Sequence, residues 1–238
     1  MSIVYDPTLV MLSIFVAIIG ALTGVAVTFG YDGSSVQLSP KSLIRGAAII
    51  GGSIWSMHFI AMLAVKFPVP IDYSTTETLL SLCVAIFFTG AGLSLGSLKG
   101  LGPLKIPVAA TIMGSGIGSM HYLGMSAIRG CGISYDINMV AASVGVGIVC
   151  AAVALWFAFR KRGAVETLVG GVVLGLAIPS MHYTGMYATS FYPVVVTFDV
   201  GAPVLSQAAL ALSVAAATLI ICGYYLFLFS SMLTHEEA

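Results

Sequence analysis

The sequence has little charge. Of its 238 residues only 8% are Asp, Glu, Lys or Arg, whereas 59% are hydrophobic, and the mean hydropathy is +1.07. A soluble domain of this length cannot bury so much apolar surface, so we expect a membrane protein. The nine basic residues balance the nine acidic ones and form no long basic tract, so no nucleic-acid partner is expected.

Two other familiar signals are absent. The four cysteines (Cys83, Cys131, Cys150 and Cys222) have neither the CxxC spacing of a zinc site nor that of a redox motif. No basic residue precedes the first apolar run, so a cleaved signal peptide is not expected. The first apolar segment is therefore expected to stay in the membrane.

Seven apolar stretches are each long enough to cross a bilayer, which takes about 20 residues in a helix. The lipid interior offers no water to the backbone, so these stretches are expected to be helices. We therefore predict a single all-α, polytopic membrane domain over residues 1–238. The predicted spans are 8–30, 42–65, 78–98, 104–128, 139–159, 165–189 and 204–231.

The basic residues indicate the orientation. In a seven-span topology seven of them fall on one side of the membrane and only Lys66 and Arg129 on the other. The positive-inside rule then places the N-terminus outside and the C-terminus in the cytoplasm. The seven residues on the inner side are Lys41, Arg45, Lys99, Lys105, Arg160, Lys161 and Arg162.

One motif, Ser-Met-His-aromatic-x-small-Met, occurs three times. Its copies span 56–62, 119–125 and 180–186, and a glycine stands seven residues before each histidine. They contain three of the four histidines and six of the eleven methionines. The second, fourth and sixth spans each carry one copy. We therefore predict three two-helix repeats (8–65, 78–128 and 139–189) followed by a seventh helix, 204–231.

The three histidines, His58, His121 and His182, are expected to share one depth. Each lies eight residues before the first polar residue of an outer loop, which is roughly 12 Å below the outer helix end. Helical repeats in membrane proteins usually form their functional site where the repeats meet. The sequence therefore predicts a histidine layer in the outer leaflet.

The motif combines imidazole with thioether. A histidine and the methionine four residues later lie on one helix face, whereas the methionine just before it points about 100° away. Either residue alone can be ordinary packing, but ionisable groups within a membrane are costly and usually functional. Imidazole and thioether together favour copper, with haem left as an alternative. The candidate ligands are His58, His121, His182, Met57, Met62, Met120, Met125, Met181 and Met186.

Polar neighbours in the motif are expected to support these ligands. Serines stand two residues before each histidine (Ser56, Ser119 and Ser180), where they can orient the ring or bond a backbone carbonyl. Tyr122 and Tyr183 directly follow their histidines, but the first copy has phenylalanine there. A tyrosine hydroxyl is therefore not an obligatory ligand.

The third copy reads Met181-His182-Tyr183-Thr184, and residues from about 8 to 231 resemble the MHYT domain, a bacterial integral-membrane sensor module. The resemblance implies copper held by Met and His residues near the outer face of the bacterial inner membrane. It also implies sensing of a diatomic gas such as oxygen, carbon monoxide or nitric oxide, and a cytoplasmic signalling domain as partner. The first two copies depart from the pattern at Phe59, Ile60 and Leu123.

The leading hypothesis is a copper-binding sensor of a diatomic gas or of redox state, and not an enzyme. A copper transporter or carrier is the first alternative, although the inner halves of the spans contain only one further Met or His, Met113. A copper-dependent membrane oxidase is the second. It would need proton-transfer groups, and the spans contain no acid well inside the membrane to serve as base.

Overall fold

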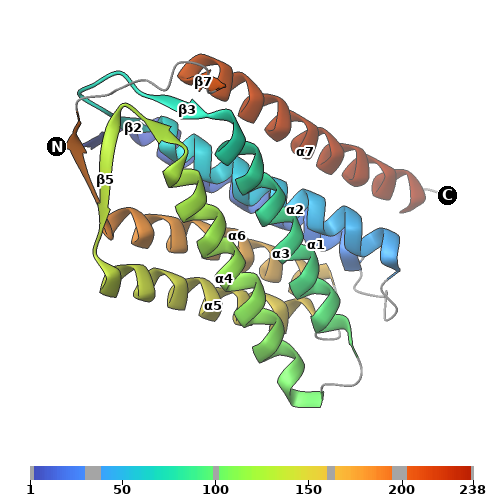
Figure 1. Ribbon diagram of the computed structural model, residues 1–238. Coiled ribbons are helices and arrows are strands. Elements are labelled where there is room, and N and C mark those ends of the chain that lie inside the picture. The colour runs from blue at the N-terminus through green and yellow to red at the C-terminus, as the bar shows by residue number, and fades with distance from the viewer. Residues whose placement is uncertain (1–2, 30–38, 99–101, 160–163, 195–202, 237–238) are drawn as a thin grey trace.

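The computed structural model describes residues 3–29, 39–98, 102–159, 164–194 and 203–236. Within these residues it contains seven α-helices that run back and forth along one bundle (Figure 1). They are α1 (Pro7–Phe29), α2 (Pro40–Leu63), α3 (Thr75–Ser97), α4 (Lys105–Ser126), α5 (Ile137–Ala158), α6 (Ala164–Tyr187) and α7 (Gln207–Glu236). A short 3-10 helix, η1 (Gly102–Leu104), leads into α4.

The predicted spans agree with these helices to within a few residues, and the all-α polytopic fold is confirmed. Six of the seven are long and apolar enough to cross a membrane. The exception is α4, which has many glycine and serine residues around its motif and is therefore less apolar than the other six helices. Four of the basic residues used for the orientation (Lys99, Arg160, Lys161 and Arg162) lie outside the described residues.

The first six helices form a closed ring of three helix pairs. Within the pairs α1 packs on α2, α3 on α4, and α5 on α6. Between the pairs α2 packs on α3, α4 on α5, and α6 returns to α1. The three predicted two-helix repeats are thus arranged around a common axis, with α2, α4 and α6 also in contact with one another.

The glycine seven residues before each histidine explains the close contact between repeats. A Cβ atom at Gly51, Gly114 or Gly175 would lie between 2.4 and 2.7 Å from a backbone Cα atom of the next repeat's first helix. No side chain fits in that space. Small residues of this kind let membrane helices approach closely. The same glycine therefore makes the same helix contact three times around the ring.

Short strands close each repeat at one end of the bundle, and the sequence interpretation missed them. The strands are β1 (Val4–Tyr5), β2 (Val65–Lys66), β3 (Asp72–Ser74), β4 (Ile128–Arg129), β5 (Cys131–Tyr135), β6 (Thr189–Pro193) and β7 (Val204–Ser206). The pairs β1–β2, β3–β4 and β5–β6 are antiparallel, and β7 adds to β3. Each pair joins the chain entering a repeat to the chain leaving it, and we call these pairs the clasps.

A backbone hydrogen bond is repeated at all three clasps. The N–H of the residue that caps the first helix of a repeat donates to an alanine carbonyl six residues after that repeat's histidine. The donor–acceptor distances are 2.8, 2.7 and 2.9 Å for Asp6–Ala64, Ser74–Ala127 and Asp136–Ala188. The clasps therefore fix the C-terminal end of each motif helix relative to its own repeat.

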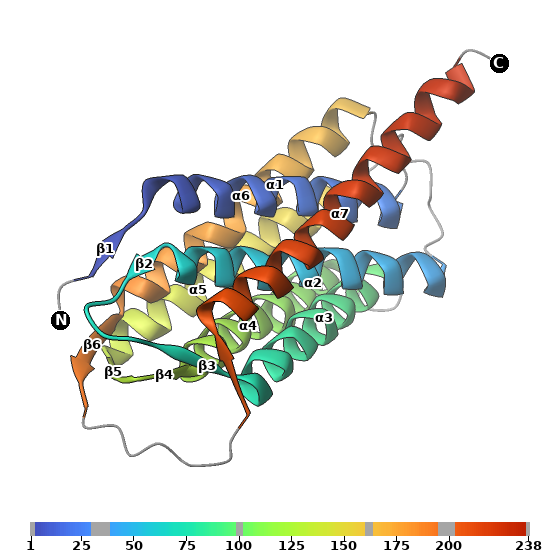
Figure 2. The same ribbon diagram turned by 90° about the horizontal axis from the view of Figure 1, so that it is seen from above.

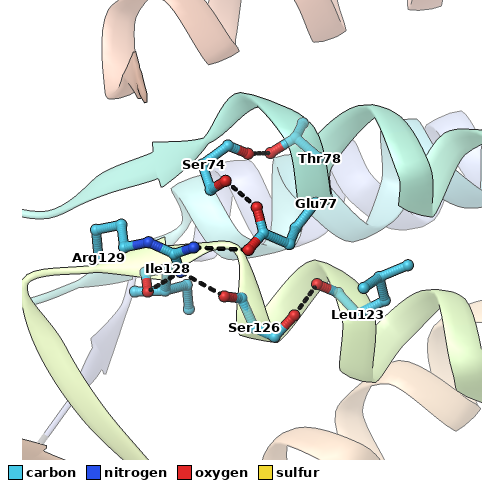
Figure 3. Close-up of polar contacts among 7 residues, drawn as sticks. All are labelled: Ser74, Glu77, Thr78, Leu123, Ser126, Ile128 and Arg129. Atoms are coloured by element: carbon cyan, nitrogen blue, oxygen red, sulfur yellow. Dashed lines mark hydrogen bonds and ion pairs between the residues drawn. The ribbon is translucent and has the colours of Figure 1, made fainter. Parts of the chain in front are cut away.

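The second clasp carries a polar cluster in addition (Figure 3). Arg129 forms an ion pair with Glu77 at 2.7 Å and donates to the carbonyl of Ser126 at 2.7 Å. The Ser74 hydroxyl donates to the other oxygen of Glu77. The cluster joins the start of α3 to the end of α4, and Glu77 also suits the positive end of the α3 dipole.

Helix α7 lies outside the ring. It packs on α1 and α2 and crosses them at an angle (Figure 2). β1 and the C-terminal end of α7 lie at opposite ends of the bundle (Figure 2). An odd number of crossings requires this placement.

Candidate metal centre

The three motif histidines meet on the axis of the ring. His58 of α2, His121 of α4 and His182 of α6 are each at most 1% exposed. Their Nδ1 atoms form a nearly equilateral triangle with sides of 3.1, 3.2 and 3.1 Å. The rings stand nearly perpendicular to one another, at 81–89°. The predicted convergence of the histidines in one layer is confirmed.

The triangle has the dimensions of one face of a tetrahedral metal site. Imidazole nitrogens bind zinc, a typical divalent ion, at about 2.0–2.1 Å. The observed spacing allows all three Nδ1 atoms to lie at that distance from one ion, so His58, His121 and His182 would hold it together.

The protonation of the rings also fits a cation. A neutral imidazole has one N–H and one lone pair, and the three Nδ1 atoms face one another. If all three present lone pairs they repel, unless a positive charge lies between them. All three Nε2 atoms are buried and have no hydrogen-bond partner. An ion bound by the three Nδ1 lone pairs leaves the proton of each ring on Nε2. The three histidines can therefore hold a metal ion.

The small residue three positions after a motif histidine leaves space for the histidine ring of a neighbouring motif helix. A Cβ atom at Gly124 would lie 2.4 Å from His58 Nε2, and one at Gly185 would lie 2.5 Å from His121 Nε2. Ala61 is the corresponding residue of the first copy. The sequence shows that this position is small in all three copies, but not that it contacts a histidine of another repeat.

The aromatic residues after the histidines connect the site to the next repeat. Each ring lies edge-on to its own histidine, with centroid distances of 4.7, 4.8 and 4.9 Å for Phe59, Tyr122 and Tyr183. The Tyr122 hydroxyl is 2.7 Å from that of Ser143 on α5, and the Tyr183 hydroxyl is 3.1 Å from that of Ser13 on α1. Both hydroxyls thus bond the first helix of the following repeat rather than a histidine.

The three motif serines do not act alike. Ser119 and Ser180 are exposed and donate to carbonyls of their own helix four residues earlier, at 2.9 Å in both cases. Of the two roles expected for these serines, both hydroxyls bond a backbone carbonyl, and neither orients a histidine ring. Ser56 is fully buried and its hydroxyl has no hydrogen-bond partner.

The six motif methionines are all buried, with exposed fractions of 0–4%. Met181 lies against α5 and α4, where Cβ atoms at Gly147 and Gly118 would be 3.3 and 3.6 Å from its side chain. Long side chains on a helix lean toward its N-terminus. The methionine at the fourth position after each histidine therefore leans back toward the histidine layer. Their ligation of a metal stays a prediction. The six are Met57, Met62, Met120, Met125, Met181 and Met186.

An isoleucine layer lies one helical turn before the histidines. Ile54, Ile117 and Ile178 each stand four residues before a motif histidine and are 0%, 7% and 2% exposed. The sequence interpretation did not include them. The signal was available, because the full repeat reads Ile-x-Ser-Met-His-aromatic-x-small-Met-x-Ala in all three copies. These side chains separate the histidines from the opposite end of the bundle with apolar groups.

These features define a multi-pass membrane protein with a buried three-histidine centre. Comparison with known families gives the same class: residues 51–106, 114–171 and 175–234 each match the repeat described as "Bacterial signalling protein N terminal repeat", MHYT. The chain belongs to the MHYT family and has a membrane sensor and signalling role.

Several full-length relatives are signalling proteins. The chain is 37% identical over 193 residues to the bifunctional diguanylate cyclase/cyclic di-GMP phosphodiesterase MucR of Pseudomonas aeruginosa, covering 79% of this chain and 28% of MucR. It is 32% identical over 213 residues to the cyclic di-GMP phosphodiesterase NbdA of the same organism (86% and 26%). For the signaling protein YkoW of Bacillus subtilis the identity is 30% over 197 residues (80% and 25%). The chain thus spans about a quarter of these relatives' length, and no solved structure matches it.

Proposed function

We propose that this domain is a copper-dependent membrane sensor of a diatomic gas or of redox state. The observation that carries the proposal is the triangle of His58, His121 and His182 Nδ1 atoms, buried between three repeats at metal-binding spacing. Six buried thioethers in the same motif favour a soft ion over zinc. Hard ions would need carboxylates, and the described spans have none near the histidines.

Bound copper would supply two accessible oxidation states and a fourth coordination position for a small ligand. The residues of the chain provide the surroundings of that position. Ile54, Ile117 and Ile178 keep water away from the inner side, and the motif aromatics fix the ring orientations. Because each histidine belongs to a different repeat, a small shift of one ring moves one motif helix relative to the other two.

The signal is then a change in the relative positions of α2, α4 and α6, as in other helix-shift switches. For a ligand to cause it, the two arrangements must differ in affinity for that ligand. The partner on the output side is a cytoplasmic signalling domain or protein. The cyclic di-GMP activities in the names of MucR and NbdA suggest its class.

We propose that the N-terminus lies outside and the C-terminus in the cytoplasm. Lys41, Arg45 and Lys105 begin α2 and α4 at the end of the bundle opposite the clasps, as the positive-inside rule requires for the inner side. The histidine layer then belongs to the outer leaflet of the bacterial inner membrane.

Two other functions have less support. A copper transporter needs a path toward the cytoplasm, but the isoleucine layer follows the histidines on that side. A copper oxidase needs a proton-transfer group at the site, but the described spans have no carboxylate near the histidines, and the hydroxyls of Tyr122 and Tyr183 bond Ser143 and Ser13 instead.

Metal analysis of the purified domain tests the proposal. The wild-type protein is expected to bind copper, and the His58→Ala/His121→Ala/His182→Ala variant is expected to lose it. His235, the fourth histidine, gives the matched control: His235→Ala should retain the wild-type copper content. Equal copper in all three proteins would end the proposal. A spectral change on adding carbon monoxide or nitric oxide to the copper-loaded protein would identify the gas ligand.

A further inference from the structure

An apolar slot separates part of α7 from the ring. It has a volume of about 320 Å³ and is lined by α1 (Leu9, Leu12), α2 (Ile60, Leu63) and α7. Among the described residues that line it, Thr218 alone has a polar side chain, and its buried hydroxyl has no hydrogen-bond partner. The protein itself therefore leaves an unfilled apolar space between the seventh helix and the helix that carries His58.

A polar cavity of about 700 Å³ lies directly beyond the outer end of this slot. Leu63 lines both spaces, and successive turns of α7 continue from one to the other, with Ala208 in the cavity and Ala211 in the slot. We call the outer space the mouth. It lies at the level of the clasps, where α2 ends and α7 begins, so its walls belong to the membrane boundary and those of the slot to the lipid interior.

The mouth contains charges of both signs. Its wall includes Lys66, Asp72 and Gln207. The Lys66 side chain is 66% exposed, and its ammonium group lies 3.5 Å from the carboxylate of Asp6. One cation beside two acids does not match a purely anionic headgroup. It matches a headgroup with a phosphate and an ammonium group.

We propose that the slot and its mouth bind one zwitterionic phospholipid of the phosphatidylethanolamine class. Its phosphate lies at Lys66, its ammonium group at Asp72, and one acyl chain fills the slot between α7, α1 and α2. The bound lipid is then part of the contact that holds α7 to the ring. Ile60 is two residues from His58, so the acyl chain lies against the same helix that contributes a histidine to the centre. This site is independent of the proposed metal function.

Native mass spectrometry of the purified domain tests the site. The domain would be exposed to phosphatidylethanolamine or to phosphatidylglycerol at equal concentration. We expect one retained phosphatidylethanolamine per chain and at least tenfold weaker retention of phosphatidylglycerol. Photoreactive phosphatidylethanolamine in nanodiscs should label the slot helices α1, α2 and α7 more than α3 and α5.

Two substitutions in the site and one outside it complete the test. Lys66→Gln removes the phosphate partner, and Ala215→Phe fills the slot, so each should reduce retention at least tenfold. Val149→Phe introduces the same side chain at an exposed position of α5 and should retain the lipid. Circular dichroism establishes that all three are folded. Equal retention of the two lipids, uniform labelling of the lipid-facing helices, or full retention by Lys66→Gln and Ala215→Phe would overturn the proposal.

Discussion

Replacing Gly124 by alanine tests the geometry of the centre most directly. The added Cβ atom would lie 2.4 Å from His58 Nε2, whereas ordinary contacts begin at 3.4 Å, so the ring must move by about 1 Å. Metal–nitrogen distances tolerate only about 0.2 Å. We therefore expect copper affinity to fall on the order of 100-fold, the upper end of the range for residues that support a ligand.

The same substitution has a separable effect on stability. Alanine in place of helical glycine stabilises by about 0.5–1 kcal/mol, whereas overpacking costs about 1–3 kcal/mol. The net expectation for Gly124→Ala is a loss of about 1–2 kcal/mol, measured by thermal unfolding without metal. Gly145→Ala on α5 is the matched control, because nothing lies within 4 Å of the added Cβ atom. It should gain stability and bind copper normally.

Competition with a copper(I) chelator gives the affinities. If Gly124→Ala binds copper as tightly as Gly145→Ala does, the His58 ring is not held against α4 and the three-nitrogen centre is refuted. Gly185→Ala repeats the experiment on His121, since its Cβ atom would lie 2.5 Å from that ring's Nε2. Both variants should therefore lose affinity to a similar degree.

Three further predictions concern the surroundings of the site. Tyr183→Phe removes the hydrogen bond to Ser13 and should lower the free energy of unfolding by about 0.5–1.5 kcal/mol, measured by thermal unfolding. The copper content should stay unchanged. A loss of copper would instead identify the Tyr183 hydroxyl as a ligand. The backbone N–H of Thr8, which donates to Asp6, is the main cause that holds the pKa of Asp6 below its ordinary value of 3.8. Wild type should therefore lose this contribution only as the pH falls below about 4, and Asp6→Asn should lack that acid-side loss in melts from pH 3 to 7. A metal at 100 times its Kd adds about 2.7 kcal/mol to the free energy of unfolding. A chelator should therefore lower the melting temperature of the wild type and leave that of the triple-histidine variant unchanged.

The repeat allowed much of the site to be predicted. Matched depth and alternate spans place His58, His121 and His182 in one layer, and membrane helices leave few ways to arrange that layer other than around an axis. The seven helices follow from hydropathy, because the lipid interior permits no unpaired backbone. Both predictions use periodic signals that the chain repeats three times.

Other features depend on contacts between segments far apart in sequence. The clasps contain strands of two to five residues, and their pairing exists only because the ring brings the two ends of each repeat together. The contact between Gly124 and His58 joins different repeats, so helical periodicity within one repeat cannot reveal it. The different behaviour of Ser56 and Ser119 also follows from packing, because one is buried and the other exposed.

The closed ring has a consequence for biosynthesis. Its last contact joins α6 to α1, and the third nitrogen of the centre comes from His182 on α6. A chain emerging from the ribosome therefore has only two of the three nitrogens until its final repeat enters the membrane and docks against the first. Metal capture should accordingly be a late event in assembly, and a chain arrested after the second repeat should not retain the ion.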